Sequence, residues 1–177
     1  MAPAANAPIS IRPMRLEDLP EVERIDKASF SLPWPPSAYR YELNENRHSM
    51  LFVAEDQTDP AHPRVVGHIV IWFIVDEAHI ASIAVHPDYR GRGIGQHLIA
   101  RSLQETIRKG FQVATLEVRE NNLTAQKLYQ RFGFEVVGRR FRYYRDNNED
   151  ALIMTISTLD DQYLAWLESG AWASETP

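Results

Sequence analysis

The residues from Arg90 to Gly95 combine basic side chains with glycines in a spacing that suits the binding of an anion. The stretch reads Arg-Gly-Arg-Gly-Ile-Gly and stands between a β-branched segment at residues 79–85 and a segment at residues 94–109 with helical apolar spacing. Glycines let successive backbone N–H groups point into one concavity, and the N-terminus of the following helix adds a partial positive charge. The sequence therefore predicts a pyrophosphate site formed mainly by backbone, to which Arg90 and Arg92 add charge-assisted contacts.

Three other interpretations of this stretch are open. An isolated Gly/Arg hexapeptide is often only a flexible, solvated turn. A nucleotide-hydrolysing P-loop would need Gly-Lys-Ser/Thr, whereas Gln96 and His97 follow here. A dinucleotide-binding Rossmann turn is the stronger alternative, because Glu117 ends the next predicted strand near the spacing expected of a ribose-binding acid. Against it, the glycines occupy every second position and not the G-x-G-x-x-G register, and five residues separate them from the preceding strand.

The rest of the chain predicts one α/β domain whose elements position this loop. Apolar periodicity and turn residues give the order β-α-α-β-β-β-α-β-α-β-β, followed by a short C-terminal amphipathic helix. The sequence shows no internal repeat. Strands are predicted at residues 10–12, 50–55, 65–75, 79–85, 113–119, 134–141 and 151–156, and helices at residues 19–30, 37–44, 94–109, 122–132 and 159–167.

Local signals set the boundaries of several elements. Asp18 with Glu21 three residues later predicts a capping-box-like start for the first helix. Gly67 is expected to interrupt the strand at residues 65–75, and residues 32–36, rich in proline, predict a rigid aromatic loop. The expected division is a disordered lead-in at residues 1–8, a domain at residues 9–157 and a helix with a tail at residues 158–177.

Composition narrows the class of protein. The 177 residues are 44% hydrophobic and 24% charged, which is typical of a globular domain, and the net charge of −5 argues against bulk binding of nucleic acid. The longest apolar run, residues 69–75, is too short to span a bilayer, so a cytoplasmic protein is expected. The absence of cysteine excludes disulfides, thiolate metal sites and a cysteine nucleophile, and the six histidines show no metal-ligand spacing. They are expected to be structural or exposed.

The loop Arg90-x-x-Gly93-x-Gly95 after an Ile-Ala-Val strand resembles the acetyl-CoA motif of the GNAT N-acetyltransferase superfamily, and the resemblance covers residues 9–156. Within the superfamily the chain is most similar to bacterial ribosomal-protein-alanine N-acetyltransferases. The chain departs from that pattern at Arg90, where glutamine is common, at the loop near Asp59-Pro60 and beyond Thr158. The narrower similarity rests on the Pro33-Trp34 pair and on three stretches: Leu116-Glu117-Val118-Arg119 with Asn122, Leu128-Tyr129-x-x-Phe132-Gly133-Phe134, and Tyr143-Tyr144 followed by Glu149-Asp150-Ala151.

This resemblance implies a fold, a reaction and a partner. The fold would be a single domain with a mixed, mostly antiparallel central sheet flanked by helices. The reaction would transfer an acetyl group from acetyl-CoA to a protein N-terminus, most specifically the N-terminal alanine of a small-subunit ribosomal protein. Direct attack in a ternary complex is favoured because no cysteine is available to form an acyl-enzyme. The protein is expected to be a monomer or weak dimer without direct contact to nucleic acid. Acetylation of lysine side chains, acetylation of a small amine such as a polyamine, and a non-catalytic acetyl-CoA-binding module are open alternatives.

The resemblance also assigns catalytic roles. Glu117 would be the general base that accepts the amine proton, directly or through a water molecule. Tyr129, twelve residues later on the following helix, would protonate the coenzyme A thiolate. Together the two residues would divide the base and acid roles of general acid–base catalysis. Taken alone, Glu117 is better interpreted as a surface carboxylate at a strand end, and only its motif context favours the catalytic role. Tyr129 is also compatible with a core aromatic residue.

Contacts to acetyl-CoA are implied along the loop and the preceding strand. The amides of residues 83–85 would bind the pantetheine arm as an added strand does, and one would polarise the thioester carbonyl. Asn121 or Asn122 is expected to cap the helix after the strand at residues 113–119, and Asn122 serves either as a helix cap alone or also as a cofactor contact. The full set is Ile83, Ala84, Val85, Arg90, Gly91, Arg92, Gly93, Ile94, Gly95, Gln96, Asn122 and Tyr129.

The acceptor side gives a weaker signal. Trp34, Tyr143 and Tyr144 would wall a groove for a peptide N-terminus, although packing in the core or in a hairpin explains each of these aromatics equally well. A carboxylate among residues 146–150 would attract the positive charge of the peptide. The arginines at 139, 140, 142 and 145 are expected to form a solvated basic strand face, with RNA contact as the weaker alternative.

Overall fold

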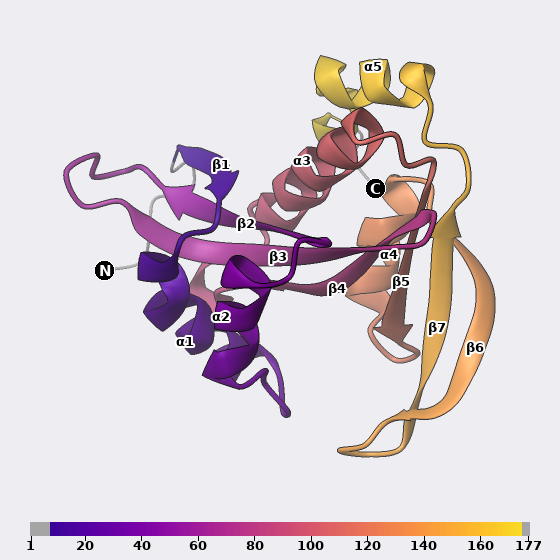
Figure 1. Ribbon diagram of the computed structural model, residues 1–177, viewed down its shortest axis with the longest axis horizontal. Coiled ribbons are helices and arrows are strands. Elements are labelled where there is room, and N and C mark those ends of the chain that lie inside the picture. The colour runs from indigo at the N-terminus through magenta and orange to yellow at the C-terminus, as the bar shows by residue number, and fades with distance from the viewer. Residues whose placement is uncertain (1–7, 175–177) are drawn as a thin grey trace. The chain divides into compact units, whose positions relative to one another are not determined.

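The computed structural model describes residues 8–174, so the predicted lead-in at residues 1–8 lies almost wholly outside the described part (Figure 1). Within the described residues, short 3-10 turns lie at Leu16–Asp18, Pro87–Tyr89 and Ala171–Ala173. The order of elements confirms the predicted order: β1 (Ile9–Pro13), α1 (Leu19–Ser29), α2 (Pro36–Asn44), β2 (Ser49–Asp56), β3 (Arg64–Ile74), β4 (Glu77–Val85), α3 (Ile94–Arg108), β5 (Val113–Arg119), α4 (Leu123–Arg131), β6 (Glu135–Tyr144), β7 (Glu149–Ile156) and α5 (Asp161–Ser169).

The strands are hydrogen-bonded in the order β1-β2-β3-β4-β5-β7-β6. Strands β4 and β5 run parallel, whereas β1 with β2, β2 with β3, β5 with β7 and β6 with β7 run antiparallel. This pattern confirms the predicted mixed, mostly antiparallel sheet. The chain forms two compact units, the first made of the described residues up to Trp72 with 82–102, and the second of 73–81 with those from Leu103 onward.

The first unit has a bulge where an interruption was predicted. Gly67 does not break β3; instead Ala54 pairs with Gly67 and Glu55 with Val65, so that Val66 is the extra residue on β3. A Cβ atom on Gly67 would lie 3.1 Å from the Ala84 carbonyl oxygen and 3.3 Å from a Leu98 methyl group. Glycine is therefore needed here because the β3 backbone closely approaches β4 and α3.

The start of α1 corrects the predicted capping box. A 3-10 turn precedes the helix and holds Asp18 at φ −79 and ψ −17, whereas a capping residue has extended dihedral angles. The Asp18 carboxylate instead accepts hydrogen bonds from the Arg15 N–H at 2.7 Å and from both terminal nitrogens of Arg12 at 2.8 Å. Glu21 binds Arg24, one turn further along α1. Asp18 therefore holds the segment that precedes α1 and does not cap the helix, and Glu21 forms a separate pair with Arg24.

The second unit contains a longer hairpin than the sequence predicted. Strand β6 continues to Tyr144 and β7 begins at Glu149, so the two tyrosines at 143 and 144 belong to a strand and not to a loop. The pairing is irregular between Arg140 and Tyr144, where Arg142 has a φ of +50. Figure 1 shows β6 and β7 side by side, in orange, within this unit.

The C-terminal helix packs against the end of α4. The helix begins at Asp161 with Asp160 as its cap, so Leu159 precedes it and is not part of it, contrary to the prediction. The rings of Trp166 and Trp172 lie 5.9 and 5.8 Å from the Phe132 ring. The Tyr163 hydroxyl donates to the Phe132 carbonyl oxygen at 2.5 Å. The helix and the 3-10 turn after it thus pack against Phe132, the residue that follows α4.

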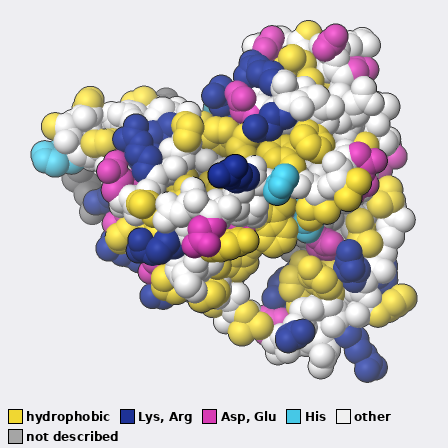
Figure 2. Space-filling view, viewed as in Figure 1, with side chains coloured by type: hydrophobic (Ala, Val, Ile, Leu, Met, Phe, Trp, Pro, Cys, Tyr) yellow, Lys and Arg dark blue, Asp and Glu magenta, His cyan; other side chains and the backbone are white. Residues whose placement is uncertain are grey.

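Basic and acidic side chains are interspersed on the face shown in Figure 2 and do not gather into one large basic patch there. Among residues 8–174, no helix has the length and apolar character needed to cross a bilayer.

Candidate active site

The predicted anion loop lies in the first unit, between the 3-10 turn and α3. Gly91 and Gly93 have φ values of +75 and +74, in the left-handed region that glycine adopts without a steric cost. The His97 N–H donates to the Gly93 carbonyl oxygen at 3.1 Å, and the N–H groups before it belong to the first turn, where a helix leaves its donors unpaired. This geometry fits the diphosphate of coenzyme A, because the backbone N–H donors lie at the N-terminus of α3, where the helix dipole is positive.

The two arginines of the loop also fix its backbone. The Arg90 Nε donates to the Val85 carbonyl oxygen at 3.0 Å, and its Nη2 donates to the Ser29 hydroxyl at 3.0 Å. The Arg92 Nη2 donates to the Asp88 carbonyl oxygen at 3.1 Å. The arginines therefore hold the loop to β4 and to the preceding turn, and their contact with a phosphate stays a prediction.

We expect Gly93→Ala to raise the KM for acetyl-CoA about tenfold, which corresponds to about 1.4 kcal/mol. An alanine Cβ disfavours the φ of +74 by about 1–2 kcal/mol, so the loop would leave the conformation that presents its N–H groups. Steady-state kinetics and calorimetric titration with coenzyme A measure the effect. Gly110→Ala is the matched control because Gly110 has a φ of +90 just beyond the end of α3. The control should lose stability and keep the wild-type KM; equal KM values in both variants would contradict the site.

Glu117 lies in the second unit as part of a polar cluster. Its Oε2 lies 2.5 Å from His79 Nε2, and its Oε1 accepts from Arg140 Nε at 3.1 Å. The side chain is 11% exposed, and β5 continues to Arg119, so Glu117 is neither a surface carboxylate nor a strand end. The hydrogen bond from His79 lowers the pKa of Glu117 below its ordinary value, with a further contribution from Arg140, although burial acts in the opposite direction. Glu117 is therefore ionised at neutral pH.

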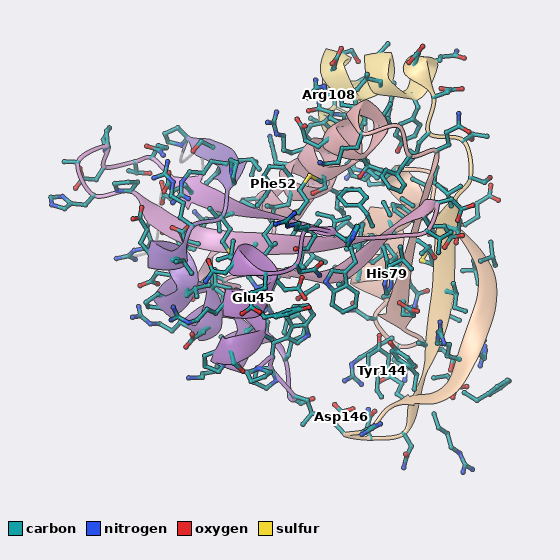
Figure 3. The ribbon with its side chains drawn as sticks, viewed as in Figure 1. Glu45, Phe52, His79, Arg108, Tyr144 and Asp146 are labelled. Carbon is teal, nitrogen blue, oxygen red and sulfur yellow. The ribbon has the colours of Figure 1, made fainter. Side chains whose placement is uncertain are left out.

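Sequence reasoning missed His79 and Arg140 as neighbours of Glu117. His79 pairs with Thr115 in the parallel register of β4 and β5, and side chains two residues apart share a face of a strand, which places His79 beside Glu117. Figure 3 labels His79 on β4. The arginines at 139 and 140 are exposed, as predicted for a solvated face of β6, but they also form ion pairs that were not predicted: Arg140 binds Glu117, and Arg139 binds Glu120 at 2.6 Å.

Tyr129 lies on α4 in the second unit and is 6% exposed. Its ring contacts Phe134 edge-on, with 5.9 Å between the ring centroids, so the predicted packing role is present. Burial raises the pKa of the Tyr129 hydroxyl well above its ordinary value, and the phenol therefore carries its proton at neutral pH. A protonated phenol is the form that a proton donor requires. Asn122 caps α4, since its side-chain oxygen accepts from the Ala125 N–H at 3.1 Å.

The predicted acceptor residues make packing contacts within their own units. In the first unit, Trp34 stacks on Trp72 with 5.7 Å between centroids and tilts against Tyr39 at 5.2 Å. In the second unit, the rings of Tyr143 and Tyr144 meet edge-on at 5.2 Å, and burial raises the pKa of Tyr144 to about 12. Their contact with a peptide stays a prediction.

The carboxylates expected to attract a peptide are bound to arginines of β5 and β6. Asp146, labelled in Figure 3, and Glu149 both bind Arg119, at 2.7 and 3.3 Å. Asp150 binds Arg139 at 3.2 Å and accepts a hydrogen bond from the backbone N–H of Arg142 on β6. These bonds stabilise the hairpin, so the acidic residues have a structural role that does not require the binding of a peptide.

Comparisons with known proteins agree with this geometry. The model of the "Acetyltransferase (GNAT) family" matches residues 19–134. A Bacillus subtilis protein, provisionally named a ribosomal protein bS18-alanine N-acetyltransferase, is 38% identical over 148 residues, which cover 84% of this chain and 95% of that protein. The crystal structure of the ribosomal-protein-S18-alanine N-acetyltransferase from Escherichia coli has a TM-score of 0.74 and 28% identity, over 85% of this chain and 94% of that one. The NatC complex bound to Gag peptide and CoA has a chain with a TM-score of 0.75 and 26% identity, over 84% of this chain and 98% of that one.

The family resolves the alternatives left open for the glycine-rich loop. Its model spans the loop, the helix after it and the strand that carries Glu117, so the Rossmann and P-loop interpretations are set aside. GNAT enzymes take their acetyl group from acetyl-CoA, which agrees with the backbone donors at the start of α3. The chain belongs to the GNAT family of acetyltransferases.

Proposed function

We propose that this protein transfers the acetyl group of acetyl-CoA to the N-terminal α-amino group of a protein, and that its acceptor is the N-terminal alanine of a small-subunit ribosomal protein in the cytoplasm. The observation that carries the proposal is the ionised, largely buried carboxylate of Glu117 between His79 and Arg140, because such a group accepts a proton from an amine. The names of the Bacillus subtilis and Escherichia coli relatives support the acceptor.

The reaction needs two proton transfers and one bond exchange. The amine nitrogen bonds to the acetyl carbon while the carbon–sulfur bond breaks. An α-amino group has a pKa of about 8, so a modest base suffices, and Glu117 takes this proton directly or through a water molecule. The Tyr129 hydroxyl returns a proton to the departing thiolate, and a backbone N–H among residues 83–85 polarises the carbonyl.

Thiol release from acetyl-CoA with a panel of acceptors tests the proposal. The panel holds a ribosomal peptide that starts with alanine, the same peptide with a blocked N-terminus and free lysines, and a polyamine. We expect product only from the peptide with the free N-terminus. Acetylation of the blocked peptide or the polyamine would instead indicate one of the other acceptor classes, and coenzyme A binding without any product would favour a binding module.

A further inference from the structure

Glu117 is held by donors from two other strands. His79 on β4 contacts Oε2, and Arg140 on β6 contacts Oε1, so each carboxylate oxygen has its own partner. Two contacts to different oxygens fix both the position and the plane of a carboxylate, which a single contact does not. Within the second unit, the Glu117 carboxylate is therefore oriented by its protein neighbours.

The direction of the first hydrogen bond follows from the charge of Glu117. An ionised carboxylate accepts hydrogen bonds only, so the proton between the two groups belongs to His79 Nε2. His79 is 18% exposed and Glu117 is 11% exposed, so the bond is screened far less than a surface pair. His79, on β4, is thus a hydrogen-bond donor to Glu117, the proposed base.

We propose that His79 is a positioning residue for acetyl transfer: its Nε2–H holds the Glu117 carboxylate in one orientation as the acceptor of the amine proton, while Arg140 holds the other oxygen. This inference rests on the proposed function of Glu117. It assigns a role in the reaction to a histidine for which the sequence predicted none.

The donor role of His79 affects how the reaction rate depends on pH. The titratable and charged groups that face Glu117 are His79 from β4 and Arg140, Tyr143 and Tyr144 from β6. Loss of the His79 N–H removes the largest contribution that lowers the pKa of Glu117, and burial then raises that pKa. The protonated, inactive form of Glu117 would therefore appear at a higher pH than in the wild type.

This change is visible in the slope of log kcat/KM against pH. In the wild type Glu117 stays ionised between about pH 5 and pH 7, and deprotonation of the acceptor amine, with a pKa of about 8, gives a slope of one. In His79→Phe, Glu117 also titrates, and the slope steepens towards two at the acid end. A shift of one pKa unit lowers the rate at the acid end about tenfold beyond any loss at neutral pH.

Three variants test the donor role. His79→Phe should lower kcat at pH 7 about tenfold, because a misplaced base costs up to about 100-fold, and should leave coenzyme A affinity unchanged. His79→Gln keeps an N–H donor and should restore both the slope and most of the rate. His62→Phe is the matched control: His62 also lies beside a carboxylate, that of Asp59 at 3.1 Å, but its side chain is 85% exposed.

The outcomes separate this inference from the proposed function. A wild-type slope and kcat in His79→Phe, or an equal defect in His79→Gln and His79→Phe, would overturn the donor role. Glu117→Gln is measured in parallel. If Glu117→Gln loses turnover while both His79 variants keep it, only the role of His79 fails; if Glu117→Gln keeps turnover, the base assignment itself fails.

Discussion

Glu117→Gln lowers kcat by about 10²–10⁴-fold on our account and leaves coenzyme A affinity unchanged. Glutamine has nearly the shape of glutamate, and its side-chain oxygen still accepts the hydrogen bond from His79. The neutral amide cannot take the amine proton, so the chemical step loses its base. The amide nitrogen replaces the oxygen that accepts from Arg140, whose side chain is 53% exposed and so has water as an alternative partner. Steady-state kinetics with a saturating acceptor, with calorimetric titration of coenzyme A, measure both quantities.

Glu120→Gln is the matched control for this substitution. Glu120 lies three residues further along the chain and also binds an arginine, Arg139, at 2.6 Å, but it is 37% exposed. Its loss should change kcat by less than about threefold, because an exposed ion pair contributes about 1 kcal/mol or less. Wild-type turnover in Glu117→Gln, or equal losses in the two variants, would show that Glu117 is not the base.

Asp26→Ala is expected to have the largest effect on stability, about 3–5 kcal/mol. Asp26 is fully buried in the first unit, where its carboxylate accepts from the Tyr39 hydroxyl at 2.6 Å and lies 2.7 Å from His68 Nε2. Burial, followed by the charge of Asp26, raises the pKa of Tyr39 far above its ordinary value, so this hydroxyl remains a donor. Removal of the carboxylate leaves two buried polar side chains without their shared partner.

Denaturant unfolding followed by circular dichroism measures this loss. Arg24→Ala on the same helix is the control, since its ion pair with Glu21 is exposed and should contribute less than about 0.5 kcal/mol. Asp26→Asn should fall between the two, because an amide keeps one acceptor. A cost below about 1 kcal/mol for Asp26→Ala would contradict the picture of a tightly coupled buried cluster.

Sequence patterns were sufficient for the elements whose signals are local. Strand β5 occupies residues 113–119, as its alternating apolar residues predict, and glycines end α3 and α4 near the expected positions. The predicted capping box failed because a 3-10 turn holds Asp18 in helical dihedral angles, and its carboxylate binds Arg12, which also binds Glu55, 43 residues beyond Arg12. The contact between Arg12 and Glu55 depends on the pairing of β1 with β2, which a local capping motif does not show.

The same reason limits what the sequence shows of the site. Glu117 and Tyr129 were assigned from motif resemblance, but 38 residues separate Glu117 from His79, and only the parallel register of β4 and β5 brings them together. The Asp26–His68 contact likewise joins residues 42 apart. Local periodicity identifies strands and helices, whereas the neighbours of a polar side chain depend on which strands pair and in what register.

Acetylation of one peptide that carries both kinds of amine tests the central claim most directly. The peptide starts with the free alanine of the ribosomal protein and contains internal lysines, so both kinds of amine compete on one molecule. Tandem mass spectrometry of the product locates the added acetyl group. Our account predicts the acetyl group on the α-nitrogen of alanine and unmodified lysines; an acetyl group on a lysine side chain, with a free N-terminus, would contradict it.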